Sequence, residues 1–406
     1  MNRARRNFLL AGAGAAVVAG AYLTRQSLLP RAEASARQPL WIPPLLDARE
    51  QRQSLSLKAQ GGSKEFFPGK RSATLGYNGS YLGPTLRVHR GDDVQVAVTN
   101  ALREETTVHW HGLLIPGDRD GGPHQTIAPG ATWRTLLPVR QAGATLFYHS
   151  HVHGRTAEQV YAGLAGVLLV HDPLEDHLGL PAQYGVDDLP LVIQDRQFDD
   201  GRLVMPGGMM TMMHGRLGDT LLVNGTPNAE VRVPARMVRL RLVNGSNARI
   251  YEVSFDDRRP FQWIASEGGL LAAPVALRSL TLAPGERAEI LVDFSDGRPA
   301  SLLPGVGNNG MRMGPMGRMG GMGAMGPGAA SDQVLLSFIP SGSAPGISPL
   351  PSRLAHWRGP DAGRAARRRS FSLDMSMAGM MGGMGSSGRS GTDDHGAFAI
   401  NGRPFD

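Results

Sequence analysis

Thr107-Val-His-Trp-His-Gly112 and Phe147-Tyr-His-Ser-His-Val-His-Gly154 are the two segments on which the fold prediction depends. Both combine aromatic and β-branched residues without a helical period, so each is predicted to form a β-strand. Side chains at positions i and i+2 of a strand project from the same face. Two such strands side by side would therefore direct imidazoles at a common point, with Trp110 and Ser150 on the opposite face. The converging residues would be His109, His111, His149 and His151.

This pattern favours a metal site. One His-x-His segment is commonly a pair of surface histidines, but the 406-residue chain has only 12 histidines and five of them lie in these two windows. Four imidazoles without a thiolate suit a borderline divalent transition metal, copper or zinc rather than calcium or magnesium.

The composition predicts an all-β protein of several domains. A chain of 406 residues exceeds one ordinary core, and 54 Gly and 29 Pro without a long amphipathic helix indicate short strands joined by turns. Residues 94–99 alternate with period two, residues 132–139 form a further strand, and residues 163–170 are apolar on both faces, as in a central strand. We predict β-domains at 37–175 and 185–340, a linker at 341–363, and the start of a third, incomplete domain at 364–406.

Residues 1–36 are predicted to be an export signal. Arg5-Arg6-Asn7-Phe8 opens a run of apolar and small residues, and small-residue cleavage sites follow at 32–36. This arrangement resembles a twin-arginine signal, which implies a periplasmic or otherwise exported protein. An uncleaved anchor is the alternative, but so short a Gly/Ala-rich run would span a bilayer poorly, and we expect no stable membrane span.

Charge and cysteine content narrow the functional classes. Five arginines and one glutamate in the first 36 residues account for more than half of the net charge of +7, and the remainder gives no reason to expect a nucleic-acid partner. The chain has no cysteine. An exported protein of this kind cannot form disulfides, so sheet packing must stabilise it.

Several motifs resemble those of the multicopper oxidases, with bacterial copper-efflux (cuprous) oxidases and bacterial laccases as the nearest match. The resemblance extends from about Trp41 to the end of the chain. The motifs occur in the family's order and are Gly76-Tyr-Asn-Gly-Ser80, His89-Arg-Gly-Asp92, His109-Trp-His-Gly112, Asp120-Gly-Gly-Pro123, Tyr148-His-Ser-His151 and Gly163-Leu-Ala-Gly166. The resemblance implies tandem cupredoxin-like Greek-key sandwiches.

The resemblance also implies roles for individual residues. His109 resembles the type 2 copper ligand, and His111, His149 and His151 resemble type 3 ligands. Asp120 resembles the acidic residue that delivers protons to dioxygen, a catalytic role, although an Asp before Gly-Gly is also an ordinary turn residue. His153 is interpreted as an outer partner of the site. His89, His124, His171 and His395 are interpreted as surface residues.

The family's remaining copper ligands are missing from this sequence. The His-Pro-x-His-x-His and His-Cys-His motifs of its C-terminal domain are absent, which removes the type 1 copper site and half of the trinuclear ligands. The implied function is oxidation of Cu(I) or phenols coupled to reduction of dioxygen to water, and copper tolerance. The chain alone, either a fragment or a natural short version, is expected to be inactive.

Two non-enzymatic alternatives remain. One is a cupredoxin-repeat scaffold of the cell-division type that has lost its copper ligands, against which the four retained histidines argue. The other is a copper-binding or copper-buffering protein. Methionine-rich tracts support copper binding, because the thioether groups of methionine are soft ligands that favour Cu(I), although an inert linker would have the same composition. These tracts contain Met311, Met313, Met316, Met319, Met322 and Met325, then Met375, Met377, Met380, Met381 and Met384, and, before His214, Met209, Met210, Met212 and Met213.

Overall fold

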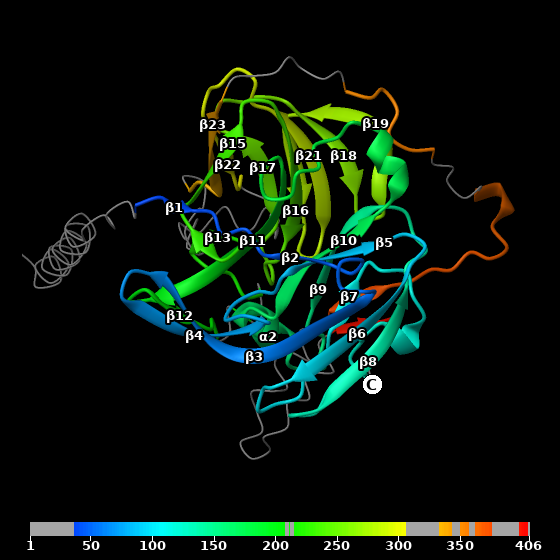
Figure 1. Ribbon diagram of the computed structural model, residues 1–406. Coiled ribbons are helices and arrows are strands. Elements are labelled where there is room, and N and C mark those ends of the chain that lie inside the picture. The colour runs from blue at the N-terminus through cyan, green and yellow to red at the C-terminus, as the bar shows by residue number, and fades with distance from the viewer. Residues whose placement is uncertain are drawn as a thin grey trace, which may run out of the picture. The chain divides into compact units, whose positions relative to one another are not determined.

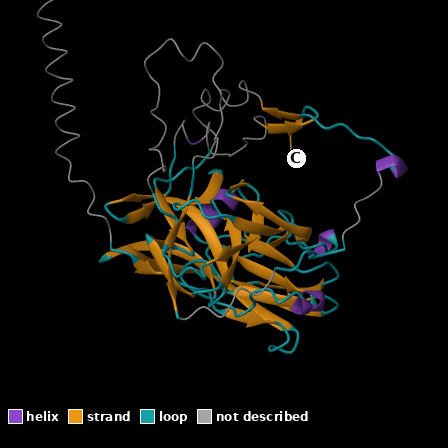
Figure 2. Ribbon diagram, turned by 90° about the horizontal axis from the view of Figure 1, so that it is seen from above, coloured by secondary structure: helices purple, strands orange, loops and turns teal. Residues whose placement is uncertain are grey.

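The structure is a computed structural model that describes residues 36–404, apart from 208–210, 212–214, 306–332, 343–349, 357–361 and 376–397. Strands dominate the described residues, as Figure 2 shows, and the chain is all-β as predicted. The predicted signal at 1–36 lies outside the described residues except for its last position. The methionine tracts also lie outside them, apart from the backbone of Met375.

The first β-sandwich is formed by two antiparallel or mixed sheets that enclose one apolar core (Figure 1). One sheet has the order β2 (Leu45–Asp47), β5 (Thr85–His89), β10 (Ala165–His171), β9 (Ala144–His149) and β7 (His109–His111). The other has the order β4 (Lys70–Tyr77), β3 (Ser54–Phe67), β6 (Asp93–Asn100) and β8 (Thr132–Pro138). Strand β10 lies between β5 and β9, which confirms the prediction of a buried central strand from its apolar sequence.

The second β-sandwich is also built from two sheets. Its first sheet has the order β1 (Gln38–Pro39), β15 (Ala229–Pro234), β23 (Leu336–Ser341), β22 (Ala300–Leu303), β17 (Tyr251–Phe255) and β20 (Ser279–Leu282). Its second has the order β14 (Thr226–Pro227), β13 (Thr220–Val223), β11 (Asp188–Asp199), β16 (Met237–Asn244), β21 (Arg287–Asp293), β18 (Phe261–Ser266) and β19 (Gly269–Leu277), with β12 (Arg202–Val204) on β11. Strand β1 lies inside the range predicted for the first domain but pairs with β15 of the second sandwich.

The two sandwiches share a further apolar cluster. Phe66, Tyr81 and Phe147 of the first sandwich pack with Val192 and Val243 of the second. Burial of these large side chains gives the sandwiches a continuous hydrophobic contact. The second sandwich is therefore held against the sheet that contains β9.

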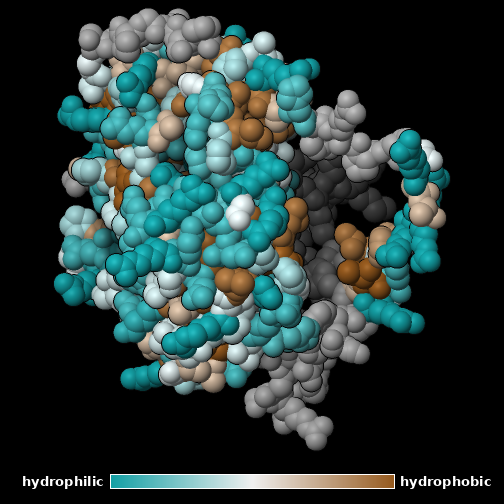
Figure 3. Space-filling view, turned by 45° about the vertical axis from the view of Figure 1, so that its right-hand side comes forward, coloured by the Kyte–Doolittle hydropathy of each residue, from teal (hydrophilic) through white to brown (hydrophobic). Residues whose placement is uncertain are grey.

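Short elements complete the description. These are α2 (Thr156–Ala162), the 3-10 helices η1 (Gly117–Arg119), η2 (Pro173–His177) and η5 (Ala362–Arg364), and a small sheet of β24 (Leu373–Met375), β25 (Phe398–Ile400) and β26 (Arg403–Pro404). No helix among the described residues is long and apolar enough to cross a membrane. On the face drawn in Figure 3, hydrophobic residues form separate small groups among hydrophilic ones.

Candidate metal centre

The two histidine segments lie on adjacent antiparallel strands. His109 of β7 is opposite His149 of β9, and Trp110 is opposite Tyr148. The strand alternation sends Trp110 and Tyr148 into the apolar core, where both side chains are fully buried, and leaves the imidazoles on the other face. The predicted pairing of the two segments is confirmed, as is the position of Trp110 on the face opposite the imidazoles.

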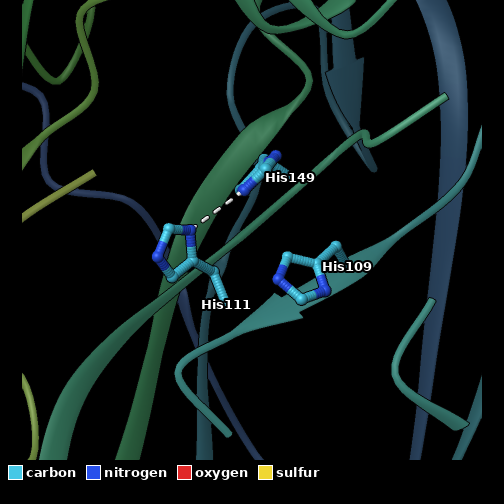
Figure 4. Close-up of side chains that lie close together, drawn as sticks. All are labelled: His109, His111 and His149. Carbon is cyan, nitrogen blue, oxygen red and sulfur yellow. Dashed lines mark hydrogen bonds between the residues drawn. The ribbon is translucent and has the colours of Figure 1, made fainter. Parts of the chain in front are cut away.

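Three imidazoles converge at this face (Figure 4). One nitrogen from each of His109, His111 and His149 lies within 4.8 Å of the others. His111 Nδ1 and His149 Nε2 are 3.2 Å apart. Two imidazole nitrogens bound to one tetrahedral ion at 2.0–2.1 Å would be separated by about 3.3 Å. The spacing and the donor type therefore fit a transition-metal ion.

Oxygen atoms of the chain orient two of these rings from behind. His109 Nδ1 lies 3.1 Å from the carbonyl oxygen of Asp120 and 3.3 Å from its carboxylate. His149 Nδ1 lies 2.8 Å from the carbonyl oxygen of Ser150. An imidazole that donates its Nδ1 proton to such an acceptor presents an unprotonated Nε2, and this is the usual arrangement behind a metal ligand. Both rings therefore have Nε2 available for a metal.

His151 lies next to this group but beyond the end of β9. Its ring centroid is 5.2 Å from that of His109 and 5.7 Å from that of His149. Its backbone N–H donates to Thr107 Oγ1 at 2.6 Å, and its own Nδ1 is buried without a hydrogen-bond partner. A buried lone nitrogen suits a ligand atom. His153, two residues further, is exposed.

Burial keeps the converging imidazoles neutral. Loss of solvation lowers the pKa of His149 to about 3 and the pKa of His111 to about 4. The pKa of His109 is also lowered by burial, and the neighbouring Asp120 only partly opposes this. Neutral imidazoles are the form that binds metal ions, so the site is ready to coordinate at neutral pH.

A polar contact supports the second histidine segment from the other side of the sheet. Ser150 Oγ donates to Gln159 Oε1 at 2.5 Å, and Thr106 Oγ1 donates to the same oxygen at 2.8 Å. Gln159 is fully buried on α2. This helix was not predicted from the sequence, because residues 156–162 are too few to display an amphipathic period.

One predicted surface histidine lies elsewhere in the fold. His89 is buried, and its Nε2 lies 2.9 Å from the Asp47 carboxylate. The prediction of a surface residue is therefore wrong for His89, because its burial depends on a contact with Asp47 of the distant strand β2, which the local sequence does not indicate. His171 packs edge to face against it, with ring centroids 5.0 Å apart.

Comparisons with known proteins give two kinds of relative. The multicopper oxidase family model matches residues 60–175. The cell division protein FtsP of Escherichia coli (strain K12) is 44% identical over 305 residues, which cover 75% of this chain and 63% of that protein. FtsP of Yersinia pestis is likewise 44% identical over 307 residues. The chain thus spans 63% of the length of the curated relatives that it matches.

Solved structures of bacterial oxidases resemble the chain over most of its length. A laccase-like multi-copper oxidase CueO from Ochrobactrum sp. superposes with a TM-score of 0.77 and 38% identity, covering 91% of this chain and 78% of that one. A laccase from Pediococcus acidilactici Pa5930 has a TM-score of 0.75 and 32% identity, covering 92% of this chain and 72% of that one.

Proposed function

Because the chain belongs to the multicopper oxidase family, we propose that it binds copper through His109, His111, His149 and His151. The observation that supports this most directly is the 3.2 Å separation of His111 Nδ1 and His149 Nε2 between two neutral imidazoles. Nitrogen ligands of this kind suit copper and zinc, and the family implies copper. His109 would hold a type 2 ion, and the other three would contribute to type 3 ions.

The second part of the proposal is the full reaction of the family. Bound copper would supply one-electron redox chemistry. Four Cu(I) ions or four phenols would each lose one electron, and one dioxygen with four protons would become two waters. Asp120 would hold and transfer protons at its carboxylate, which is partly exposed and lies 3.3 Å from His109 Nδ1.

The absence of cysteine limits what the 406 residues do alone. Intense blue absorption in this family depends on a copper–thiolate bond, and electrons from the reducing substrate enter at that copper. We therefore propose that the chain binds copper with an ordinary tetragonal spectrum and does not complete the oxidase cycle by itself.

Metal analysis and electron paramagnetic resonance of the copper-loaded protein test this proposal. We expect bound Cu(II) with nitrogen hyperfine structure, and loss of that signal when His109, His111 and His149 are replaced together by Ala. His177→Ala is a matched control because His177 is exposed in the 3-10 helix η2. Equal copper binding by the triple variant and wild type would refute the site. Copper-dependent dioxygen uptake, or a blue colour, would refute the limit on its activity.

We also propose export by the twin-arginine pathway, which rests on Arg5 and Arg6 before an apolar run. Replacing both residues by Lys should retain unprocessed protein in the cytoplasm, as fractionation would show. Normal processing and export of that variant would remove the twin-arginine interpretation.

A role in cell division is the second candidate, favoured by 44% identity to FtsP over 305 residues. Complementation of a division defect in a host that lacks its own copy of this gene would test this role. The triple histidine variant separates the two candidates. Complementation by that variant would show that division does not need the metal site, whereas its failure, with normal protein levels, would connect the two functions.

A further inference from the structure

The turn between β20 and β21 of the second sandwich reaches the histidine cluster of the first. Gly285 in this turn has φ +80, and a Cβ built on it would lie 3.1 Å from His111 Cε1 and 3.9 Å from His111 Nε2. Contacts near 3.1 Å are closer than carbon atoms normally approach, so a side chain at this position would press on the ring. The Gly285 backbone therefore lies directly against the edge of the His111 imidazole.

Arg287 holds this turn in place from a nearly fully buried position. Its Nη1 donates to the carbonyl oxygen of Gly285 at 2.8 Å and to Glu267 Oε1 at 2.9 Å. Its Nε donates to the carbonyl oxygen of Thr145 on β9 at 3.4 Å. A Cβ on Gly112, the residue after His111, would lie only 2.5 Å from Arg287 Nη2. One guanidinium thus connects the turn with both histidine strands.

His111 needs such support more than its neighbours do. His109 and His149 each direct Nδ1 at a carbonyl oxygen, which fixes the ring. His111 directs Nδ1 at His149 instead, so this nitrogen cannot also be anchored by the backbone. The Cε1 edge of its ring, which lies between the two nitrogens, faces Gly285. Packing against the second sandwich takes the place of the outer hydrogen bond.

We propose that the second sandwich forms one wall of the metal centre, in which Gly285 sets the orientation of the His111 ring and Arg287 is a positioning residue that holds the Gly285 turn. The consequence for copper rests on the proposed function. The orientation of the His111 ring does not rest on the proposed function, because its contacts with Gly285 exist without metal. This wall could not be predicted from local sequence, since Gly285 lies far along the chain from both histidine segments.

Gly285→Ala tests the wall, with Gly297→Ala as its matched control. Both glycines have positive φ, +80 and +66, so both variants carry similar backbone strain, but a Cβ at Gly297 meets nothing within 4 Å. We expect Gly285→Ala to weaken Cu(II) binding about tenfold, the lower end of the loss seen when outer support of a ligand is removed. Gly297→Ala should bind like wild type. Chelator competition gives the affinities, and paramagnetic resonance gives the ligand field.

A crystal structure of metal-free Gly285→Ala separates this inference from the proposed function. We expect the His111 ring to turn so that Nδ1 leaves hydrogen-bond distance of His149 Nε2. If the wild-type protein binds no copper, the proposed function fails, but the position of the His111 ring in the variant still tests whether Gly285 orients this ring. An unmoved ring in Gly285→Ala would overturn the inference. So would unchanged affinity in a copper-binding protein.

Arg287→Lys supplies a second test if Gly285→Ala does not fold. Lysine keeps the charge but cannot donate to Gly285, Glu267 and Thr145 together. We expect a several-fold loss of copper affinity and an altered hyperfine splitting, whereas Arg298→Lys, at an exposed arginine, should change neither. A wild-type spectrum and affinity in Arg287→Lys would overturn the positioning role.

Discussion

Strand β9 carries two buried polar clusters on one face, and they differ in how their groups are satisfied. Thr145 belongs to a charged network in which Glu289 accepts from Thr145 Oγ1 and from Arg239 Nε, both at 2.6 Å, and from Arg241 Nη1 at 3.0 Å. Four residues further, His149 directs an unprotonated nitrogen at another imidazole. Each buried charge of the network has an oppositely charged partner, whereas the cluster consists of neutral imidazoles, with His111 Nδ1 facing His149 Nε2.

This difference indicates separate purposes for the two clusters. Arg241 also forms a two-pronged contact with Asp188, at 2.6 and 3.0 Å, so the network closes on itself between the sandwiches. A closed network of this kind fixes the positions of its side chains and leaves none of its charged groups available to bind a ligand. The histidine cluster instead directs neutral nitrogen donors at a common point. The network is therefore interpreted as structural and the cluster as a binding site.

The largest effect should come from opening the network with Glu289→Ala. Burial opposes ionisation of Glu289, but Arg239 and Arg241 outweigh burial and lower the pKa of Glu289 to about 2. Glu289 is therefore ionised, and the substitution removes a negative charge. Two buried guanidinium groups would lose their partner, and we expect a loss of about 3–5 kcal/mol in the free energy of unfolding. Urea titration measures this loss.

A surface ion pair provides the control for Glu289→Ala. Asp93 pairs with Arg140, and both side chains are more than half exposed. Asp93→Asn should leave the unfolding midpoint unchanged, because exposed pairs contribute little. Equal effects of the two substitutions on the free energy of unfolding would show that the network does not have the structural role assigned to it.

Acid should affect the histidine cluster while the network stays charged. The pKa of His149 is about 3 in the folded protein and 6.5 in the unfolded chain, so the unfolded state binds the extra proton as the pH falls below 6.5. Metal-free protein should therefore lose stability between pH 6.5 and 3, by on the order of 3 kcal/mol at pH 4 for this residue alone. Glu289, with a pKa of about 2, remains ionised over that range.

Thermal unfolding of wild type and His149→Gln between pH 7 and 4 checks this prediction. Glutamine does not titrate, so the stability of the variant should fall less steeply with pH. Other carboxylates titrate equally in both proteins and cancel in the difference. Parallel curves would mean that His149 is not buried as a neutral base.

Removing a ligand should reduce metal affinity without breaking the fold. His149→Ala deletes the nitrogen that faces His111, and we expect at least the roughly 10- to 100-fold loss of copper affinity that follows damage to a ligand's surroundings. Chelator competition measures it, and His177→Ala, at an exposed histidine of the 3-10 helix η2, is the control. An equal loss from His177→Ala would mean that the lost affinity does not come from the histidine cluster.

Much of this comparison could be predicted from local sequence, and part of it could not. A period-two pattern predicted β6, residues 132–139 were also predicted to form the strand observed as β8, and the pairing of β7 with β9 follows from two histidine segments with matched aromatic neighbours. Strand alternation correctly placed Trp110 on the face opposite the imidazoles, and the structure shows that this face is the core. These features depend on the local or periodic pattern of residues along the chain, which can be recognised in a single sequence.

The remaining features depend on contacts between residues far apart in the chain. His89 is buried because Asp47 on β2 pairs with its ring, and β2 is only three residues long. The contact of Gly285 with His111 requires the packing of two sandwiches. Glu289 and Arg241 become partners only because β21 pairs with β16 in a register that places Arg241 opposite Glu289. Tertiary placement of this kind leaves no periodic trace in a single sequence.

The smallest effect should come from Asp120→Asn, although Asp120 is the residue for which the family implies catalysis. His109 Nδ1 has two acceptors in this residue, the backbone carbonyl oxygen at 3.1 Å and the carboxylate at 3.3 Å. Asparagine retains the carbonyl oxygen, so the ring keeps its tautomer and Nε2 stays available. We expect copper affinity to fall less than about tenfold, below the loss for His149→Ala. A loss as large as that of His149→Ala would show that the carboxylate, and not the backbone, orients His109. An effect on proton transfer would instead appear only in dioxygen uptake by a complete oxidase assembly, with copper affinity nearly unchanged, because the carboxylate is needed to carry a proton and the amide cannot.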